Sequence, residues 1–342
     1  MQGMPTSISR RGAAVLAAAG LIAIAGAVGR ANAQVPDVVT FAVPPEGSSG
    51  YLMVSAFSKV ITEKTPIKKV VFQTFGGAAG WPARMHTGEV NFGAHCGFQS
   101  VQEAYFGKGP FEKPGRQKNV RNLATGYGLA YGINVIDPGI TTVQQLKGKT
   151  IFVQMTHSDQ RIAMEVIGKE AGLPLGKDLK IIPIRSPQEG IQGLLTGRAD
   201  GLAYGLVPGL TEVQRARGLH TIPIPDALLA KVREAAPVWG TVDIRAGQPP
   251  LKPEKPVRTL QIQCGLAAGA QTSADTVYQV TKAVFDNLPA WNSVHPLARQ
   301  WSLQKAVQIN VAPYHDGAVR YFKEKGVWTP ALEAKQKELL AK

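Results

Sequence analysis

Short apolar runs that alternate with amphipathic helical patterns limit the possible folds of this chain more than any other feature. In the first third of the sequence, apolar runs cover residues 38–43, 70–75 and 90–94, and a helical pattern covers residues 51–62. Strands that alternate with helices form βαβ units around a parallel sheet. The pattern therefore predicts an α/β protein, and a length of 342 residues allows two compact lobes.

A second series of the same kind begins at Asp137-Pro138-Gly139, after a long apolar stretch. Its expected strands and helices alternate at residues 150–154, 160–170, 179–184, 188–195, 202–204 and 210–217. A strand-like run at residues 257–266 then precedes mostly helical sequence. We therefore expect two lobes with two crossings between them, near residues 126–134 and 257–265. The expected boundaries are 34–128 with 262–342 for lobe I, and 129–261 for lobe II.

The N-terminus has the order of an export signal over residues 1–33. Arg10 and Arg11 precede an apolar segment at residues 13–28, and Ala31-Asn32-Ala33 supplies the small residues of a cleavage site. The arginine pair fits a twin-arginine signal, but Ala13 replaces the expected aromatic residue or leucine, so the general secretory route stays open. The sequence predicts a soluble protein of the periplasm.

Charge and motif spacing argue against several function classes. The formal net charge is +14, but no run of five like charges and no basic stripe with aromatic residues occurs, so we expect no nucleic-acid partner. The six histidines show no metal-ligand spacing, and no Gly-x-Ser-x-Gly motif is present. We expect a binding protein and no enzyme, with no cofactor and no metal. Whether Cys96 and Cys264 form a disulfide stays open at this point.

Several motifs occur in an order and at spacings that are similar to one family of receptors. The most specific is Pro-Tyr-His-Asp-Gly-Ala-Val-Arg-Tyr-Phe-Lys-Glu-Lys-Gly-Val-Trp at residues 313–328. Residues 275–282, His295-Pro296 and the shorter segments 88–93, 146–149 and 197–200 also match. On these motifs the mature chain resembles the TAXI family of solute-binding receptors, which serve TRAP transporters.

The resemblance implies both a fold and a function. The fold is a two-lobed, type II-like periplasmic-binding-protein fold with two hinge crossings and a helical C-terminal region. The function is that of a monomeric receptor, which captures a small organic acid and delivers it to TRAP membrane subunits, expected here as a fused polypeptide. Two other classes stay open: a ligand-sensing module that reports to a membrane protein, and an exported enzyme or adhesive surface protein.

Turns that precede helices form the expected ligand site. In receptors of this family, ligand groups face helix N-termini, where N–H groups lack partners and carry partial positive charge. A carboxylate is therefore the expected guest, although the serines can equally act as plain helix caps. The candidate residues are Ser48, Ser49, Tyr51, Gly77, Ala78, Ala79, Trp81, Phe98, His157, Ser158, Asp159 and Tyr204.

Departures from the family pattern indicate the kind of ligand. Ala78, Trp81, Cys96 and Phe98 stand where the family typically has Ser, Asn, Gln and Asp. An ammonium group buried without a carboxylate or amide partner is costly, so an apolar or aromatic acid fits better than an amino acid. Trp81→Ala should then weaken binding and leave the fold intact, because a cleft wall is partly wet.

Two alternatives remain for these side chains. Trp81 and Phe98 can instead pack in the core, since aromatic side chains bury well anywhere. The counter-charge for a carboxylate is equally open: Arg84, Arg161 and Arg185 are all candidates, and each can also be a solvated surface residue.

Overall fold

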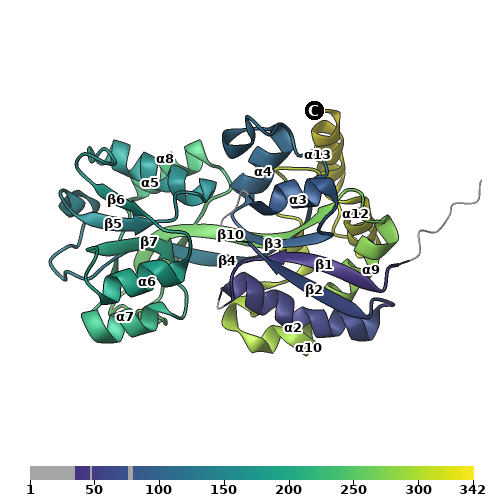
Figure 1. Cartoon of the computed structure of the whole chain (residues 1–342), viewed down its shortest axis with the longest axis horizontal. Helices are drawn as coiled ribbons and strands as arrows, with labels where there is room; N and C mark the ends of the chain where they lie inside the picture. Colours follow the sequence, from purple (N-terminus) through teal and green to yellow (C-terminus); the bar gives the residue numbers. More distant parts are fainter. Residues whose placement is uncertain (1–34, 47, 76–79) are drawn as a thin grey trace, which may run out of the picture. The chain divides into compact units, whose positions relative to one another are not determined.

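Alternating strands and helices build the structure, a computed structural model that describes residues 35–46, 48–75 and 80–342 (Figure 1). The predicted α/β fold class and the helical C-terminal region are confirmed. The expected signal segment and Gly77, Ala78 and Ala79 lie outside the described residues. Residues 35–342 form one compact unit.

Ten strands of the described chain form one sheet, in the order β2-β1-β3-β10-β4-β7-β5-β6, with β8 on β4 and β9 on β10. Their bounds are β1 Val38–Val43, β2 Lys69–Thr74, β3 Phe92–Cys96, β4 Val120–Val135, β5 Thr150–Val153, β6 Lys180–Pro183, β7 Gly201–Gly205, β8 His220–Ile222, β9 Gly240–Ile244 and β10 Val257–Gly269.

Helices cover both faces of the sheet (Figure 1). Their bounds are α2 Ser49–Lys64, α3 Gly80–Thr87, α4 Phe98–Phe106, α5 Ser158–Glu170, α6 Pro187–Leu195, α7 Leu210–Arg217, α8 Asp226–Ala235, α9 Ala274–Asp286, α10 Leu288–Trp291, α11 Leu303–Ala306, α12 Asp316–Glu324 and α13 Pro330–Ala341. Among the C-terminal helices, α9 packs against both α2 and α12.

Two βαβαβ units share the same local topology. In the unit that we call the first half, β1 lies between β2 and β3, and all three strands are parallel. In the second half, β5 lies between β6 and β7, again in parallel. In both halves, the first strand therefore lies between the two strands that follow it. This strand order creates a crevice at the carboxyl ends of parallel strands.

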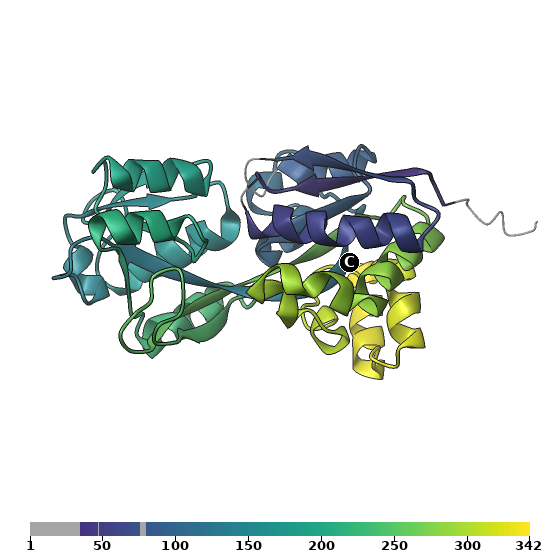
Figure 2. The same cartoon turned by 90° about the horizontal axis from the view of Figure 1, so that it is seen from below.

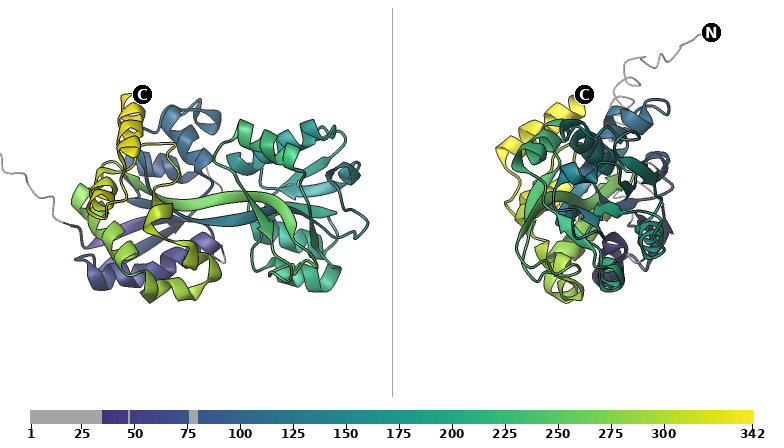
Figure 3. Two further views of the ribbon diagram at one scale, coloured as in Figure 1. Left: turned by 180° about the vertical axis from the view of Figure 1, so that it is seen from behind. Right: turned by 90° about the vertical axis from the view of Figure 1, so that its left-hand side faces the viewer.

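The long strands β4 and β10 connect the two halves (Figures 2 and 3). The start of β4 pairs with the part of β10 that also pairs with β3, and the end of β4 pairs with β7. Because β10 is antiparallel to both β3 and β4, β3 runs in the direction of β4, whereas β7 runs against it. The carboxyl ends of the strands in the two halves therefore point toward each other.

The ladder between β4 and β10 is irregular at its centre. Its register shifts between Cys264 and Gly265, and Gly126 lies opposite this irregularity without a partner. A Cβ atom at Gly126 would lie 2.3 Å from the Trp301 ring, so only glycine fits there. Cys96 and Cys264, which face each other on β3 and β10, are joined by a disulfide, and this answers the question that the sequence left open.

Candidate functional site

A cavity of about 90 Å³ lies where the carboxyl ends of the two sets of strands meet. The first half contributes residues 42–45 at the end of β1 and residues 94–96 at the end of β3. The second half contributes Gln154 after β5, Arg185 after β6, and Tyr204, Gly205 and Val207 at and just after the end of β7. This is the crevice that the topology predicts, and small-molecule sites of α/β proteins occur there.

The two walls of this cavity differ in chemistry. The wall from the first half is mainly apolar, with Ala42, Val43, Pro44, Pro45, Phe75, Trp81 and Ala94. The wall from the second half carries most of the polar side chains: Gln154, His157, Gln160, Arg185 and Tyr204. The cavity can therefore enclose a molecule that is apolar at one end and polar at the other.

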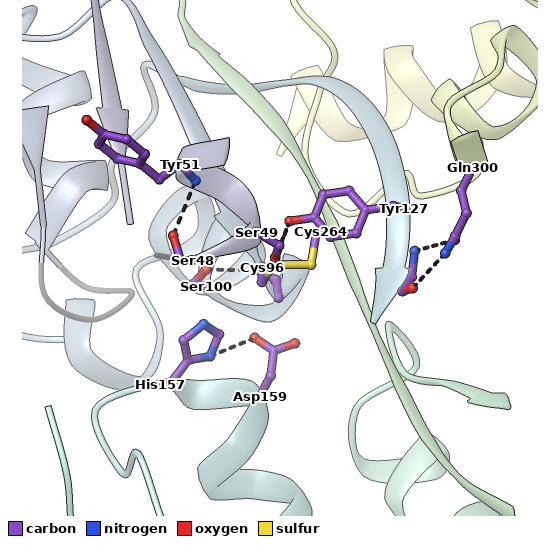
Figure 4. Close-up of a disulfide and its surroundings, with 12 residues drawn as sticks. Ser48, Ser49, Tyr51, Cys96, Ser100, Tyr127, His157, Asp159, Cys264 and Gln300 are labelled. Atoms are coloured by element: carbon purple, nitrogen blue, oxygen red, sulfur yellow. Dashed lines mark hydrogen bonds and ion pairs between the residues drawn. A yellow bond between two sulfur atoms is a disulfide. The ribbon is translucent and has the colours of Figure 1, made fainter. Parts of the chain in front are cut away.

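Ser48 and Ser49 both line the cavity, but their hydroxyl groups already have partners (Figure 4). Ser48 is the N-cap of α2, and its hydroxyl oxygen accepts a hydrogen bond from the backbone N–H of Tyr51 at 3.2 Å. The hydroxyl of Ser49 lies 2.8 Å from the hydroxyl of Tyr127. Tyr51 packs edge-on against Phe72 and lines a separate hollow of about 260 Å³.

Of the two aromatic residues singled out in the sequence, Trp81 lines the cavity and Phe98 does not. Phe98 is the first residue of α4, and its side chain points toward β10. It is therefore 0% exposed and belongs to the main core. Its ring packs edge-on against His95, which sequence reasoning missed. His95 lies on the wall at the end of β3, and burial lowers the pKa of its imidazole to about 3.

The start of α5 brings His157, Ser158 and Asp159 to the cavity, but only His157 lines it. Asp159 is 1% exposed and lies behind the wall, where burial raises the pKa of its carboxyl group to about 8. Burial lowers the pKa of His157 to about 4. The Nδ1 atom of His157 and Oδ2 of Asp159 lie 3.7 Å apart (Figure 4), which is too long for a hydrogen bond, and both groups are uncharged near pH 6.

Among the three arginines considered from the sequence, Arg185 is the one on the cavity wall. Arg84 forms an ion pair with Glu89, and Arg161 forms one with Glu165 at 2.9 Å. Arg185 is exposed, and within the described residues its guanidinium group has no carboxylate partner within 4.0 Å. It therefore places one positive charge at the mouth of the cavity.

Tyr204, the last of the predicted residues, lines the cavity from β7. Burial raises the pKa of its phenol group to about 12, so the hydroxyl stays protonated at neutral pH and can donate a hydrogen bond. Gln154 and Gln160 also line the wall and were missed. The sequence signal was the position of Gln154 as the last residue of an expected strand and of Gln160 as the first residue of an expected helix.

Two absences hold for the part of the chain that the structure describes. No helix there is long and apolar enough to cross a bilayer. No cluster of three histidine, cysteine or acidic side chains there has the arrangement of a metal site.

Comparison with known proteins gives a family and a fold. The model of the NMT1-like family matches residues 41–326. A solved periplasmic transporter is 15% identical, with 87% of this chain and 95% of that chain covered and a TM-score of 0.52, which shows that the two share a fold. The alkanesulfonate-binding protein SsuA from Xanthomonas axonopodis pv. citri, bound to MOPS, is 14% identical, with 90% and 96% covered and a TM-score of 0.47. Tv2483 bound to L-arginine is 14% identical, with 78% and 91% covered and a TM-score of 0.47.

Proposed function

The chain belongs to the NMT1-like family, and we propose that it is an extracytoplasmic solute-binding protein. In this proposal it captures a small organic carboxylate with an apolar or aromatic body. The cavity between the two halves carries the proposal, because it has one apolar wall and one polar wall with a single arginine at its mouth. The fold shared with a periplasmic transporter and the export signal expected at residues 1–33 support it.

The charges around the cavity favour an anion over a zwitterion. Arg185 is the only side chain on the described wall that is charged near neutral pH, because burial keeps His95 and His157 neutral. No Asp or Glu lines the described wall, and the nearby Asp159 lies behind it. A ligand ammonium group would therefore lose its hydration without gaining a carboxylate partner, which costs several times the thermal energy.

Capture requires that the cavity open, and we propose that it opens between lobe I, residues 34–128 and 262–342, and lobe II, residues 129–261. The hinges are then the central parts of β4 and β10, where the ladder is irregular. Closure presents both lobes together to TRAP-type membrane subunits, as the resemblance to the TAXI family implies. A receptor of this kind returns its ligand chemically unaltered.

Mass spectrometry of small molecules released from gently purified protein tests the ligand class directly. We expect a monocarboxylate without a free amine. Calorimetric titration with benzoate and with glutamate gives the second test, and benzoate should bind more tightly. Tight binding of glutamate without measurable binding of any apolar acid would contradict the proposal. Recovery of a chemically changed compound after incubation would instead indicate an enzyme.

A further inference from the structure

A cluster of polar side chains lies beside the cavity, where α4 of the first half meets α5 of the second half, and one of them, Gln160, also lines the cavity. It contains the half-buried Gln99 and the buried Glu103 on α4, and the buried Asp159 and Gln160 on α5. Within the described part of the chain, one side-chain oxygen of each of these four residues is buried without a hydrogen-bond partner. Buried polar groups are rarely left in this state, so the cluster needs an explanation beyond the cavity itself.

The N-terminus of α4 has no cap of its own. Its N-cap residue is Gly97, which has no side chain to accept a hydrogen bond from the first turn. The Oδ1 atom of Asp159 lies 3.4 Å from the backbone N–H of Gln99 and accepts its hydrogen bond instead. A carboxyl group from the second half thus occupies the capping position of a helix in the first half.

Gly97 makes this approach possible. Its φ angle of 98° lies in the left-handed region, and a Cβ atom at this position would lie 2.1 Å from Oδ2 of Asp159. It would also lie 2.6 Å from Cε1 of His157. Asp159 can therefore take its observed position only if residue 97 has no side chain, that is, only if it is glycine.

We propose that Asp159 holds the two halves closed by capping α4 across the cleft, and that this contact breaks when the halves separate. Asp159 is then a positioning residue, which sets how readily the cavity closes without touching the ligand. Among the described residues, a second hydrogen bond between the two halves outside β4 and β10 runs from Gln188 Nε2 to the carbonyl oxygen of Glu46, and it is exposed and 3.4 Å long. The inference rests on the proposed function only in that the cleft must open to admit a solute.

Hydrogen exchange of the ligand-free protein tests the proposal without knowledge of the ligand. In Asp159→Ala, the amides of Gln99 and Ser100 should exchange about five- to tenfold faster than in the wild type, because a lost helix cap is worth that factor. Asp159→Asn keeps an oxygen acceptor of the same size and should keep the wild-type rate. The first-turn amide of α2, which Ser48 caps within the first half, is the internal control and should not change.

The glycine provides a second, independent arm. Gly97→Ala should open the cleft and increase the radius of gyration in small-angle scattering. Gly172→Ala is the matched control, because Gly172 also has a positive φ of 71° but a Cβ atom there would meet nothing within 4 Å. Unchanged exchange at Gln99 in Asp159→Ala, or equal scattering from Gly97→Ala and Gly172→Ala, would overturn the inference. A failure of benzoate to bind would leave it untouched, since no ligand is used.

Discussion

The indole ring of Trp81 lies parallel to the imidazole ring of His95, with 5.4 Å between their centroids and 10° between their planes. The ring of His95 also makes a T-shaped contact with the ring of Phe98, with 4.7 Å between centroids. Trp81 and His95 both line the cavity, and His95 in turn packs against Phe98, which is a core residue. The cavity wall and the core are continuous at this point, and substitutions here affect both.

Trp81→Ala should therefore destabilise the fold as well as weaken binding. Trp81 is only 5% exposed, so the premise that this wall is partly wet is wrong. Removing a buried indole leaves a cavity, and we expect the free energy of unfolding to fall by about 3 to 5 kcal/mol. Urea unfolding measures this loss, and Trp81→Phe, which keeps a ring against His95, is the milder control. A loss below about 1 kcal/mol would show that the site collapses or is hydrated.

Phe98→Asp should unfold the protein and not admit an amino acid. The side chain of Phe98 is 0% exposed and packs in the core, so a carboxylate there would be buried without a charged partner. Thermal unfolding should show a large drop for Phe98→Asp and a small one for Phe98→Leu. If Phe98→Asp instead folded normally and bound glutamate, Phe98 would face the ligand after all.

The sequence predicted the fold better than the site. Expected strands such as residues 38–43 and 257–266 match β1 and β10 closely. Short apolar runs between helical patterns usually form strands, so this prediction depended little on the rest of the fold. The short strands β8 and β9 were not predicted. Strand β8 pairs with β4 and β9 pairs with β10. At three and five residues, both are too short for their sequence pattern to stand out.

The site was harder to predict because position in the sequence does not fix the direction of a side chain. Trp81 and Phe98 are similar aromatic residues near helix starts, yet one lines the cavity and the other is in the core. Asp159 stands at a helix N-terminus, which suggested a ligand contact, but its partner is the backbone of a helix 60 residues away. His95 carried no local signal, because its role depends on the strands that surround β3.

Arg185→Gln should weaken binding of benzoate without changing stability. The guanidinium group is exposed at the cavity mouth, so its loss removes one charged hydrogen bond to the carboxylate, worth about 1.5 to 3 kcal/mol. Arg215→Gln, at an exposed position on α7, lowers the net charge equally and serves as the control. Calorimetric titration compares the two. Equal affinities would remove Arg185 from the site.

The pH dependence of stability should have a maximum near pH 6.5. Below this value, the unfolded chain protonates His95 and His157, from the ordinary pKa of 6.5, whereas the folded chain keeps both neutral down to about 3 and 4. Stability is therefore lost as the pH falls. Above it, the folded chain keeps a proton on Asp159 up to about pH 8, whereas the unfolded carboxyl group has lost its proton at a pKa of 3.8. Stability is therefore also lost as the pH rises toward 8.

Asp159→Asn separates the two limbs of this profile. The variant lacks the titrating carboxyl group, so it should lose the alkaline decline and keep the acidic one. Urea midpoints at about pH 5, 6.5 and 8 are sufficient to see the difference. An alkaline decline that persists unchanged in Asp159→Asn would mean that another group causes it.

The bond between Cys96 and Cys264 has a consequence for how this protein survives proteases. The chain passes from β3 through the whole second half before it returns on β10, so the disulfide, with its sequence separation of 168, converts that length into a covalent ring. A single cut anywhere in the ring leaves one molecule, in which the two fragments stay joined through the disulfide. The two fragments of a nicked chain then separate only after the disulfide is reduced.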